Sequence, residues 1–230
     1  MFTFPKFSMI NGGLLYNKRG LKYLDLADSI VMAHDIVNGI SKRQSKRFNK
    51  AWKNGNIYAD PSLWIRGACY SNMNMVIRPE NNIGDIAVVN HEFGHMFFPS
   101  HFEAEHFSDE VYGCAMECVT EMKLKEMKIK TSPETFVRAM FCYHYGNVIS
   151  QINSKQLLSD NTHCRAKNFV GNAIGIDLAE RIAGKDLTLE KVLKMGPDIS
   201  AEKLARIGVN EKTIAESSVR FVKQNLALCQ

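Results

Sequence analysis

The sequence predicts an α+β fold: a small β-hairpin in the N-terminal half, two consecutive helices that carry histidines and glutamates, and a mainly helical C-terminal lobe. Two observations predict it. Residues 63–70 and 73–78 are short apolar runs rich in β-forming residues on either side of Ser71-Asn72, which is typical of a hairpin. From residue 83 onward, apolar side chains recur at helical spacing between helix start and stop signals.

Residues 21–53 precede the hairpin and are expected to form a helix, because apolar side chains recur there at helical spacing. Asn54-Gly55-Asn56 should end this segment as a turn. After the hairpin, a helix is expected to start near residue 85. Asp85 or Asn82 would be its N-cap and Pro99 its stop.

A further helix is expected over residues 109–128, with acidic side chains near its start and lysines near its end, as the helix dipole favours. The remaining chain is expected to be helical over residues 136–152, 168–183, 189–194, 201–207 and 212–226. We therefore predict two lobes. Residues 1–130 contain the hairpin and the histidine-bearing helix, and residues 131–230 are helical.

The composition is that of a globular protein without a membrane span. The 230 residues are 45% hydrophobic and 23% charged, and no apolar run approaches the length needed to cross a bilayer. Pro5 and Lys6 interrupt the apolar N-terminal residues, so no signal peptide is expected. The six cysteines form no CxxC pair and are expected to be reduced thiols. These features predict a cytoplasmic protein with no membrane partner.

His91-Glu92-Phe93-Gly94-His95 is the most informative motif of the chain. Two histidines at positions i and i+4 of a helix lie on the same face, so both imidazoles can reach one ion. Glu92 follows the first histidine and can accept a proton from a water molecule on that ion. We therefore predict a Zn²⁺ site in which His91 and His95 are ligands and Glu92 is the general base.

A catalytic zinc takes three protein ligands and keeps a fourth position for water, so a third ligand must follow the motif. His101 has the spacing of the third histidine in an HExxHxxGxxH pattern, although Phe98 stands where that pattern needs a glycine for a sharp turn. His106, just before the next helix, is another alternative.

Two glutamates on the following helix are the carboxylate candidates for the third ligand. We favour Glu110, because Gly113 and Ala115 would let the two helices approach closely enough for its side chain to reach the metal. Glu117, two turns along, stays an alternative, and Glu121 could then support it through a hydrogen bond.

Residues 83–119 resemble the glutamate-zincin (gluzincin) metallopeptidases, and within them are most similar to the ImmA/IrrE-like group. In that group a short hairpin precedes an AHELGH-type helix, and a helix with an E-A-D/N-x-F-A-A-E pattern follows. Residues 89–95 match the first element. The second element is matched at Glu110, Ala115 and Glu117.

The resemblance implies a zincin-like fold in which His91, His95 and Glu110 bind zinc and Glu92 is the base. It further implies a cytosolic regulatory protease that cuts one protein partner. Tyr112 departs from the pattern, because the group has Asp or Asn at this position.

Peptide hydrolysis is the function that we predict, with Glu92 passing a proton from the attacking water to the leaving amine. The edge of the hairpin, around residues 73–78, is expected to bind the substrate backbone as an added strand. Gluzincins often stabilise the oxyanion of the tetrahedral intermediate with a downstream Tyr or His. The candidates for that role are Tyr143, His144 and Tyr145, and packing in an aromatic core is their alternative role.

Two alternatives need no peptide cleavage. Residues 42–53 are rich in Lys and Arg, and residues 200–222 resemble a helix-turn-helix core with Gly208 at its turn. A DNA-binding regulator on a zincin scaffold would use these segments. A protein-interaction role without turnover would use zinc to hold the fold. A peptide or protein substrate is the expected partner; the basic segment allows nucleic acid, but no motif identifies it.

Overall fold

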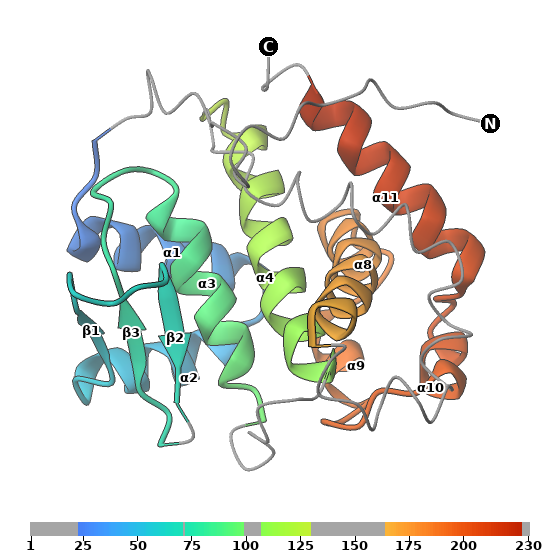
Figure 1. The fold of residues 1–230 in the computed structure, drawn as a ribbon, viewed down its shortest axis with the longest axis horizontal. Coiled ribbons are helices and arrows are strands. Elements are labelled where there is room, and N and C mark those ends of the chain that lie inside the picture. The colour runs from blue at the N-terminus through green and yellow to red at the C-terminus, as the bar shows by residue number, and fades with distance from the viewer. Residues whose placement is uncertain (1–22, 71, 99–106, 130–163, 227–230) are drawn as a thin grey trace.

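The computed structural model describes residues 23–70, 72–98, 107–129 and 164–226. It is an α+β structure made mostly of helices with a small three-stranded sheet, as the sequence predicts. In Figure 1 the sheet and the first three helices lie on one side of the long helix α4 (Phe107–Glu126), and α8 (Cys164–Ala183) lies on the other. Helix α4 is therefore the central element of the fold.

The predicted N-terminal helix is two helices, α1 (Leu26–Ile40) and α2 (Lys42–Lys53). Ser41 separates them in an extended conformation, and its hydroxyl oxygen accepts a hydrogen bond from the Gln44 backbone N–H at 3.1 Å. The two helices fold back on each other, with the His34 and Phe48 rings 5.7 Å apart. The stretch is therefore helical as expected over residues 26–40 and 42–53, but it is divided at Ser41, because a serine N-cap starts a new helix at this point.

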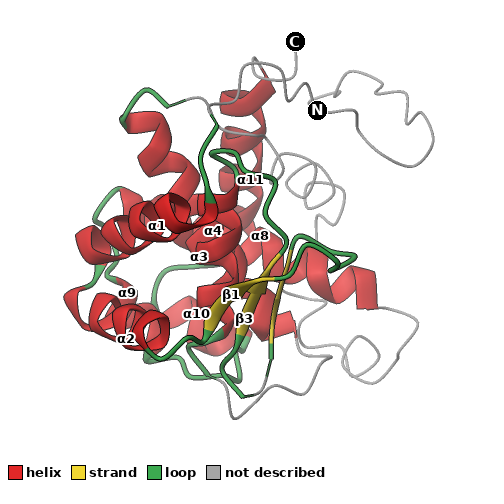
Figure 2. Ribbon diagram, turned by 90° about the vertical axis from the view of Figure 1, so that its left-hand side faces the viewer, coloured by secondary structure: helices red, strands yellow, loops and turns green. Residues whose placement is uncertain are grey.

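The sheet has the strand order β1-β3-β2 (Figure 2). The predicted hairpin is present, with shorter strands than expected, as β2 (Gly67–Cys69) and β3 (Met75–Ile77) in antiparallel register. The sequence did not indicate β1 (Ile57–Ala59), which pairs with β3 in parallel. Because β3 is paired on both sides, the expected substrate edge at residues 73–78 is wrong. The edge of the hairpin is β2.

Helix α3 (Asp85–His95) carries the histidine motif. Its N-cap is Gly84, which has no capping side chain, so neither Asn82 nor Asp85 is the N-cap. Both side chains instead hold the preceding loop: the Asn82 side-chain oxygen accepts from the Gly84 N–H at 2.8 Å, and the Asp85 carboxylate accepts from the Glu80 N–H at 3.1 Å. The helix ends at His95, before Pro99.

Three helices follow α8: α9 (Leu189–Leu193), α10 (Ala201–Arg206) and α11 (Glu211–Leu226). Helix α8 packs closely on α4 at Gly175, where an added Cβ would lie 2.8 Å from the Cys114 Cβ and 2.9 Å from the Ala115 nitrogen. One continuous hydrophobic core joins the sheet and the helices. Among the described helices, none combines the length and apolarity that crossing a bilayer requires.

Candidate metal centre

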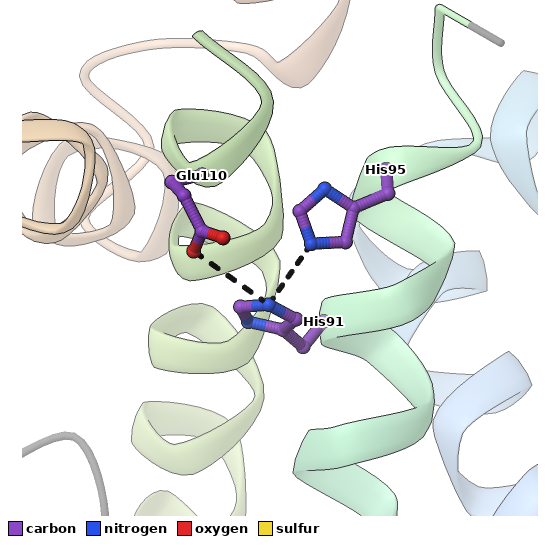
Figure 3. Close-up of side chains that lie close together, drawn as sticks. All are labelled: His91, His95 and Glu110. Carbon is purple, nitrogen blue, oxygen red and sulfur yellow. Dashed lines mark hydrogen bonds and ion pairs between the residues drawn. The ribbon is translucent and has the colours of Figure 1, made fainter. Parts of the chain in front are cut away.

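The two motif histidines lie side by side on one face of α3. Their Nε2 atoms are 3.0 Å apart, and the rings meet edge to face with centroids 4.8 Å apart. Phe93 and Val89 on the opposite side of the helix are fully buried in the core, which fixes the orientation of the helix about its axis. Figure 3 shows both rings pointing from α3 toward α4.

Glu110 completes the group from α4. One of its carboxylate oxygens lies 3.9 Å from the His91 Nε2 atom, and the three ligand atoms of His91, His95 and Glu110 all lie within 4.8 Å of one another (Figure 3). Two imidazole nitrogens and one carboxylate oxygen are a donor set that suits a divalent transition metal. This is the group of side chains that the described residues offer for such an ion.

Two glycines let the helices come close enough for this arrangement. A Cβ added at Gly94 of α3 would lie 2.5 Å from the Tyr112 carbonyl oxygen and 2.7 Å from the Gly113 Cα, so the two backbones touch here. A Cβ added at Gly113 of α4 would lie 3.0 Å from both histidine Nε2 atoms. Gly113 therefore leaves open the space beside the ligand nitrogens. Ala115, expected to help the same approach, packs against α8 instead.

Glu117 contacts the opposite nitrogen of His91. Its Oε2 atom lies 2.8 Å from His91 Nδ1, and its side chain is almost completely buried. A carboxylate on Nδ1 keeps the proton on that nitrogen and leaves the Nε2 lone pair free for a metal. Glu110 and Glu117 therefore occupy different places: Glu110 lies with the Nε2 atoms, whereas Glu117 orients the His91 ring.

Glu92 points toward the sheet. Its side chain is buried, and a Cβ added at Gly67 of β2 would lie 2.6 Å from its Oε1 atom. Gly67 thus gives the Glu92 carboxylate room between α3 and the edge strand. This places the carboxylate against β2, an outer strand of the described sheet.

A buried ion pair fixes β2 relative to α3. The Arg66 guanidinium donates to the Asp85 carboxylate at 2.7 Å, and Asp85 is fully buried in the first turn of α3. Arg66 immediately precedes Gly67, and its carbonyl accepts from the Arg78 N–H at 2.8 Å. The position of Gly67 against Glu92 therefore depends on a side chain at the other end of α3.

Tyr112 connects α4 to the C-terminal segment. Its hydroxyl donates to the Gly196 carbonyl at 2.6 Å, and its ring packs against Phe97 and Phe98 with centroids 6.1 Å and 5.1 Å away. Tyr112, which departs from the resembled pattern, therefore contacts two separate segments: the residues just after α3 and the loop that follows α9.

Cys114 and Cys118 lie next to each other on α4 and are fully buried, with their sulfur atoms 3.8 Å apart. Burial raises the pKa of the Cys118 thiol well above its usual value, and the neighbouring Cys114 thiol and the Glu121 and Glu117 carboxylates add to the shift. A thiol in these surroundings stays protonated at neutral pH, so Cys118 belongs to the core.

One face of the C-terminal helix α11 packs against α8. Gly208 has a φ of +78° at the turn between α10 and α11, as a tight turn requires. The Thr213 and Ser217 hydroxyls of α11 donate to the buried Asp177 carboxylate of α8 at 2.9 Å and 2.8 Å. Ser218 is also buried. Thr213 and Ser217 therefore face α8, whereas Lys212 and Glu216 of the same helix are exposed.

The other predicted site residues lie outside the described part of the chain. These are the alternative ligands His101 and His106 and the oxyanion candidates Tyr143, His144 and Tyr145. Comparison of the chain with protein-family models, with curated proteins and with solved structures gave no match in any of the three.

Proposed function

We propose that this chain is a zinc-dependent metallopeptidase of the zincin type, with His91, His95 and Glu110 as the metal ligands. The observation that carries the proposal is the convergence of these three side chains from two helices. Glu92 directly follows His91 on α3, and its side chain is buried. A structural zinc site has no need of a buried glutamate directly after one of its histidines, whereas peptide hydrolysis needs a general base.

The donor set suits zinc in geometry as well as in chemistry. Ligand atoms about 2.1 Å from a tetrahedral zinc lie about 3.4 Å apart. Two of the three corresponding separations are 3.0 Å between the histidine nitrogens and 3.9 Å between His91 and Glu110, and all three lie within 4.8 Å. Small side-chain rotations would bring all three to a common centre. The open space beside Gly113 supports the same assignment, since a methyl group there would press on both nitrogens.

A zinc ion in this place would polarise the peptide carbonyl and lower the pKa of a water molecule. The chain's own contribution to the chemistry is Glu92, which accepts a proton from the attacking water and donates it to the leaving amine. Its burial between α3 and β2 excludes bulk water and keeps the carboxylate in one orientation.

The substrate backbone is proposed to pair with β2. Within the described chain β2 pairs with β3 alone, through Arg66, Ala68 and Tyr70, so the backbone groups of Gly67 face the other side. A peptide added along this edge would pair with the backbone of Gly67, the residue that packs against the Glu92 carboxylate.

Trp64 stands three residues before the Gly67 contact and is 84% exposed. The loop that carries it is fixed, because the Arg78 guanidinium donates to the Leu63 and Trp64 carbonyls at 3.1 Å and 3.0 Å. An exposed indole on a loop whose backbone is fixed in this way favours a substrate with an apolar side chain at the matching position.

The test combines metal content with peptide cleavage. Metal would be measured by plasma mass spectrometry, and cleavage with a fluorogenic peptide library, for the wild type, Glu92→Gln, Glu110→Gln and the control Glu126→Gln on the exposed end of α4. We expect about one zinc per chain in the wild type, Glu92→Gln and Glu126→Gln. Glu110→Gln should bind zinc weakly, and both Glu92→Gln and Glu110→Gln should lose cleavage.

Two outcomes would overturn the proposal. A folded wild-type chain that takes up no metal after reconstitution would remove the metal centre. One zinc per chain without cleavage of any library peptide would instead favour the alternative, an interaction or DNA-binding protein on this scaffold without turnover.

A further inference from the structure

Helix α2 has a charge pattern that the proposed metallopeptidase does not use. Its twelve residues contain six Lys or Arg and no acidic residue, so this helix alone carries more positive charge than the net +5 of the whole chain. Five of the six are exposed: Lys42, Arg43, Lys46, Lys50 and Lys53.

The exposed cations form a single ridge. At 3.6 residues per turn, Lys42, Lys46, Lys50 and Lys53 fall within about 80° of one another around the helix and span about 16 Å of its length. Arg43 widens the ridge on one side. The opposite face packs into the core through Phe48 and Ala51. The cations therefore point together away from the protein.

The sixth cation, Arg47, is turned inward. Its guanidinium donates to the Phe97 carbonyl at 3.1 Å and also to the Met96 carbonyl, at the C-terminal end of α3. Burial lowers the pKa of Arg47 below its usual value, and the Arg43 charge adds to this. These hydrogen bonds give Arg47 a structural role. Among the described residues the five exposed cations form no ion pair, although Lys42 donates to the Asn38 side-chain oxygen at 3.1 Å.

The ridge costs stability. Like charges one turn apart, such as Lys42 with Lys46 and Lys46 with Lys50, destabilise a helix by about 0.2–0.5 kcal/mol per pair. Lys42 and Arg43 also stand in the first turn, where the helix dipole disfavours positive charge. An arrangement that works against its own helix is understandable if a negatively charged partner neutralises it.

The chemistry of the ridge favours phosphate. Lysine is depleted in protein–protein interfaces, which rely on aromatic and other apolar anchors. None of the large exposed apolar side chains of the described chain belongs to α2, and Trp52 packs against the core. A lysine-rich face without apolar anchors is suited to a regular array of anionic groups. A ridge of about 16 Å runs alongside about nine phosphate charges of a duplex.

From these observations we propose that the exposed ridge of α2, formed by Lys42, Arg43, Lys46, Lys50 and Lys53, binds the phosphate backbone of nucleic acid without reading its sequence. The site is on a different helix from the α10–α11 pair. The proposed nucleic-acid site uses none of the residues of the candidate metal centre. Its test is therefore independent of the proposed peptidase activity.

The test is the salt dependence of binding to a fluorescein-labelled 20-base-pair duplex of arbitrary sequence, followed by anisotropy on the full chain. The variant Lys42→Gln/Lys46→Gln/Lys50→Gln removes three charges from the ridge. The matched control Lys125→Gln/Lys185→Gln/Lys212→Gln removes three exposed lysines from other elements. Circular dichroism would confirm that both variants remain folded.

We expect the wild type to bind with a negative slope of log affinity against log salt concentration. The ridge variant should lower the steepness of that slope by about three and weaken binding by about tenfold or more at 0.1 M salt, while the control changes much less. A second duplex of different sequence should bind equally well, and Glu92→Gln should bind like the wild type.

Three results would overturn the proposal. Equal losses in both triple variants would show an effect of overall charge and not of the ridge. Binding of polyglutamate but not of the duplex would assign the ridge to an acidic protein. Binding of phosphatidylserine vesicles but not of the duplex would assign it to a lipid surface.

Discussion

The Glu117 carboxylate lies 2.8 Å from the Nδ1 atom of His91, on the side of the imidazole opposite to Glu110. One histidine is thus held between two carboxylates of the same helix, α4. Residues 110, 113 and 117 share one face of that helix, because they are three and four positions apart. A single helical face therefore carries the proposed ligand Glu110, the open space at Gly113 and the Glu117 carboxylate that orients His91.

The first prediction concerns Glu117. Replacing Glu117 with Ala leaves the buried Nδ1–H without its acceptor, and we expect metal affinity to fall about 10–100-fold. Glu117→Gln keeps an acceptor oxygen and should lose less. Competition with a chromogenic chelator would measure both variants, with Glu126→Gln as the control. Unchanged affinity in Glu117→Ala would show that Glu117 does not orient His91.

Local pattern was sufficient to predict the histidine-bearing helix and the hairpin. The spacing of apolar residues and the turn-forming residues are properties of short segments. Helix α3 and the connection between β2 and β3 are determined by residues that are close in sequence. The same kind of signal could have located the break at Ser41. Ser41-Lys42-Arg43-Gln44 has the S-x-x-Q form of a capping box, and the structure has the Ser41 N-cap.

Tertiary relationships were beyond the sequence for a physical reason. The role of Glu117 depends on how α3 crosses α4, and that crossing is fixed by Gly94 and Gly113 meeting backbone to backbone. The Arg66–Asp85 ion pair and the parallel pairing of β1 with β3 likewise join segments that no local period relates. The sequence pattern named Glu110 and Glu117 as candidate ligands, and the packing of α3 on α4 determines which nitrogen of His91 each of them approaches.

Gly113 and Gly94, which meet where α3 crosses α4, are predicted to differ in their effects: Gly113 on metal affinity and Gly94 on the stability of the fold. Gly113→Ala would place a methyl group 3.0 Å from both histidine nitrogens, so metal affinity should fall about tenfold or more. The metal-free protein should be no less stable, because Ala favours a helix over Gly by about 0.8–1.0 kcal/mol. Metal titration and urea unfolding would measure the two effects separately.

Gly94→Ala should instead destabilise the metal-free fold by about 1–3 kcal/mol, because its methyl group would meet the Tyr112 carbonyl at 2.5 Å, and backbone cannot move aside as a ring can. Equal stability losses in both alanine variants would contradict this division between a site glycine and a packing glycine.

The Arg66–Asp85 ion pair, which joins the start of β2 to α3, is predicted to stabilise the fold. Arg66→Met leaves the fully buried Asp85 carboxylate without its cation and should cost about 3–5 kcal/mol in urea unfolding. The double variant Arg66→Met/Asp85→Asn should recover part of this loss, since no unpaired charge remains. A double variant whose loss equals the sum of the single losses would show that the two side chains do not act as a pair.

Asp177 is predicted to attach α11 to α8 without affecting the metal centre. Its carboxylate accepts from Ser217 and Thr213 of α11 and from Arg181 on its own helix at 3.2 Å. Asp177→Ala would leave the buried Ser217 hydroxyl without its acceptor, so the amides of α11 should exchange with solvent faster by about tenfold or more, the equivalent of about 1–3 kcal/mol.

Hydrogen exchange read by mass spectrometry would resolve α11 from α3 and α4. Asp177→Asn keeps an acceptor oxygen and should give an intermediate result. Metal affinity should stay at the wild-type value in both variants, because Asp177 packs on the side of α8 that meets α11, whereas α4 meets α8 at Gly175. Loss of metal together with α11 protection would show instead that the C-terminal helices and the metal centre unfold as one unit.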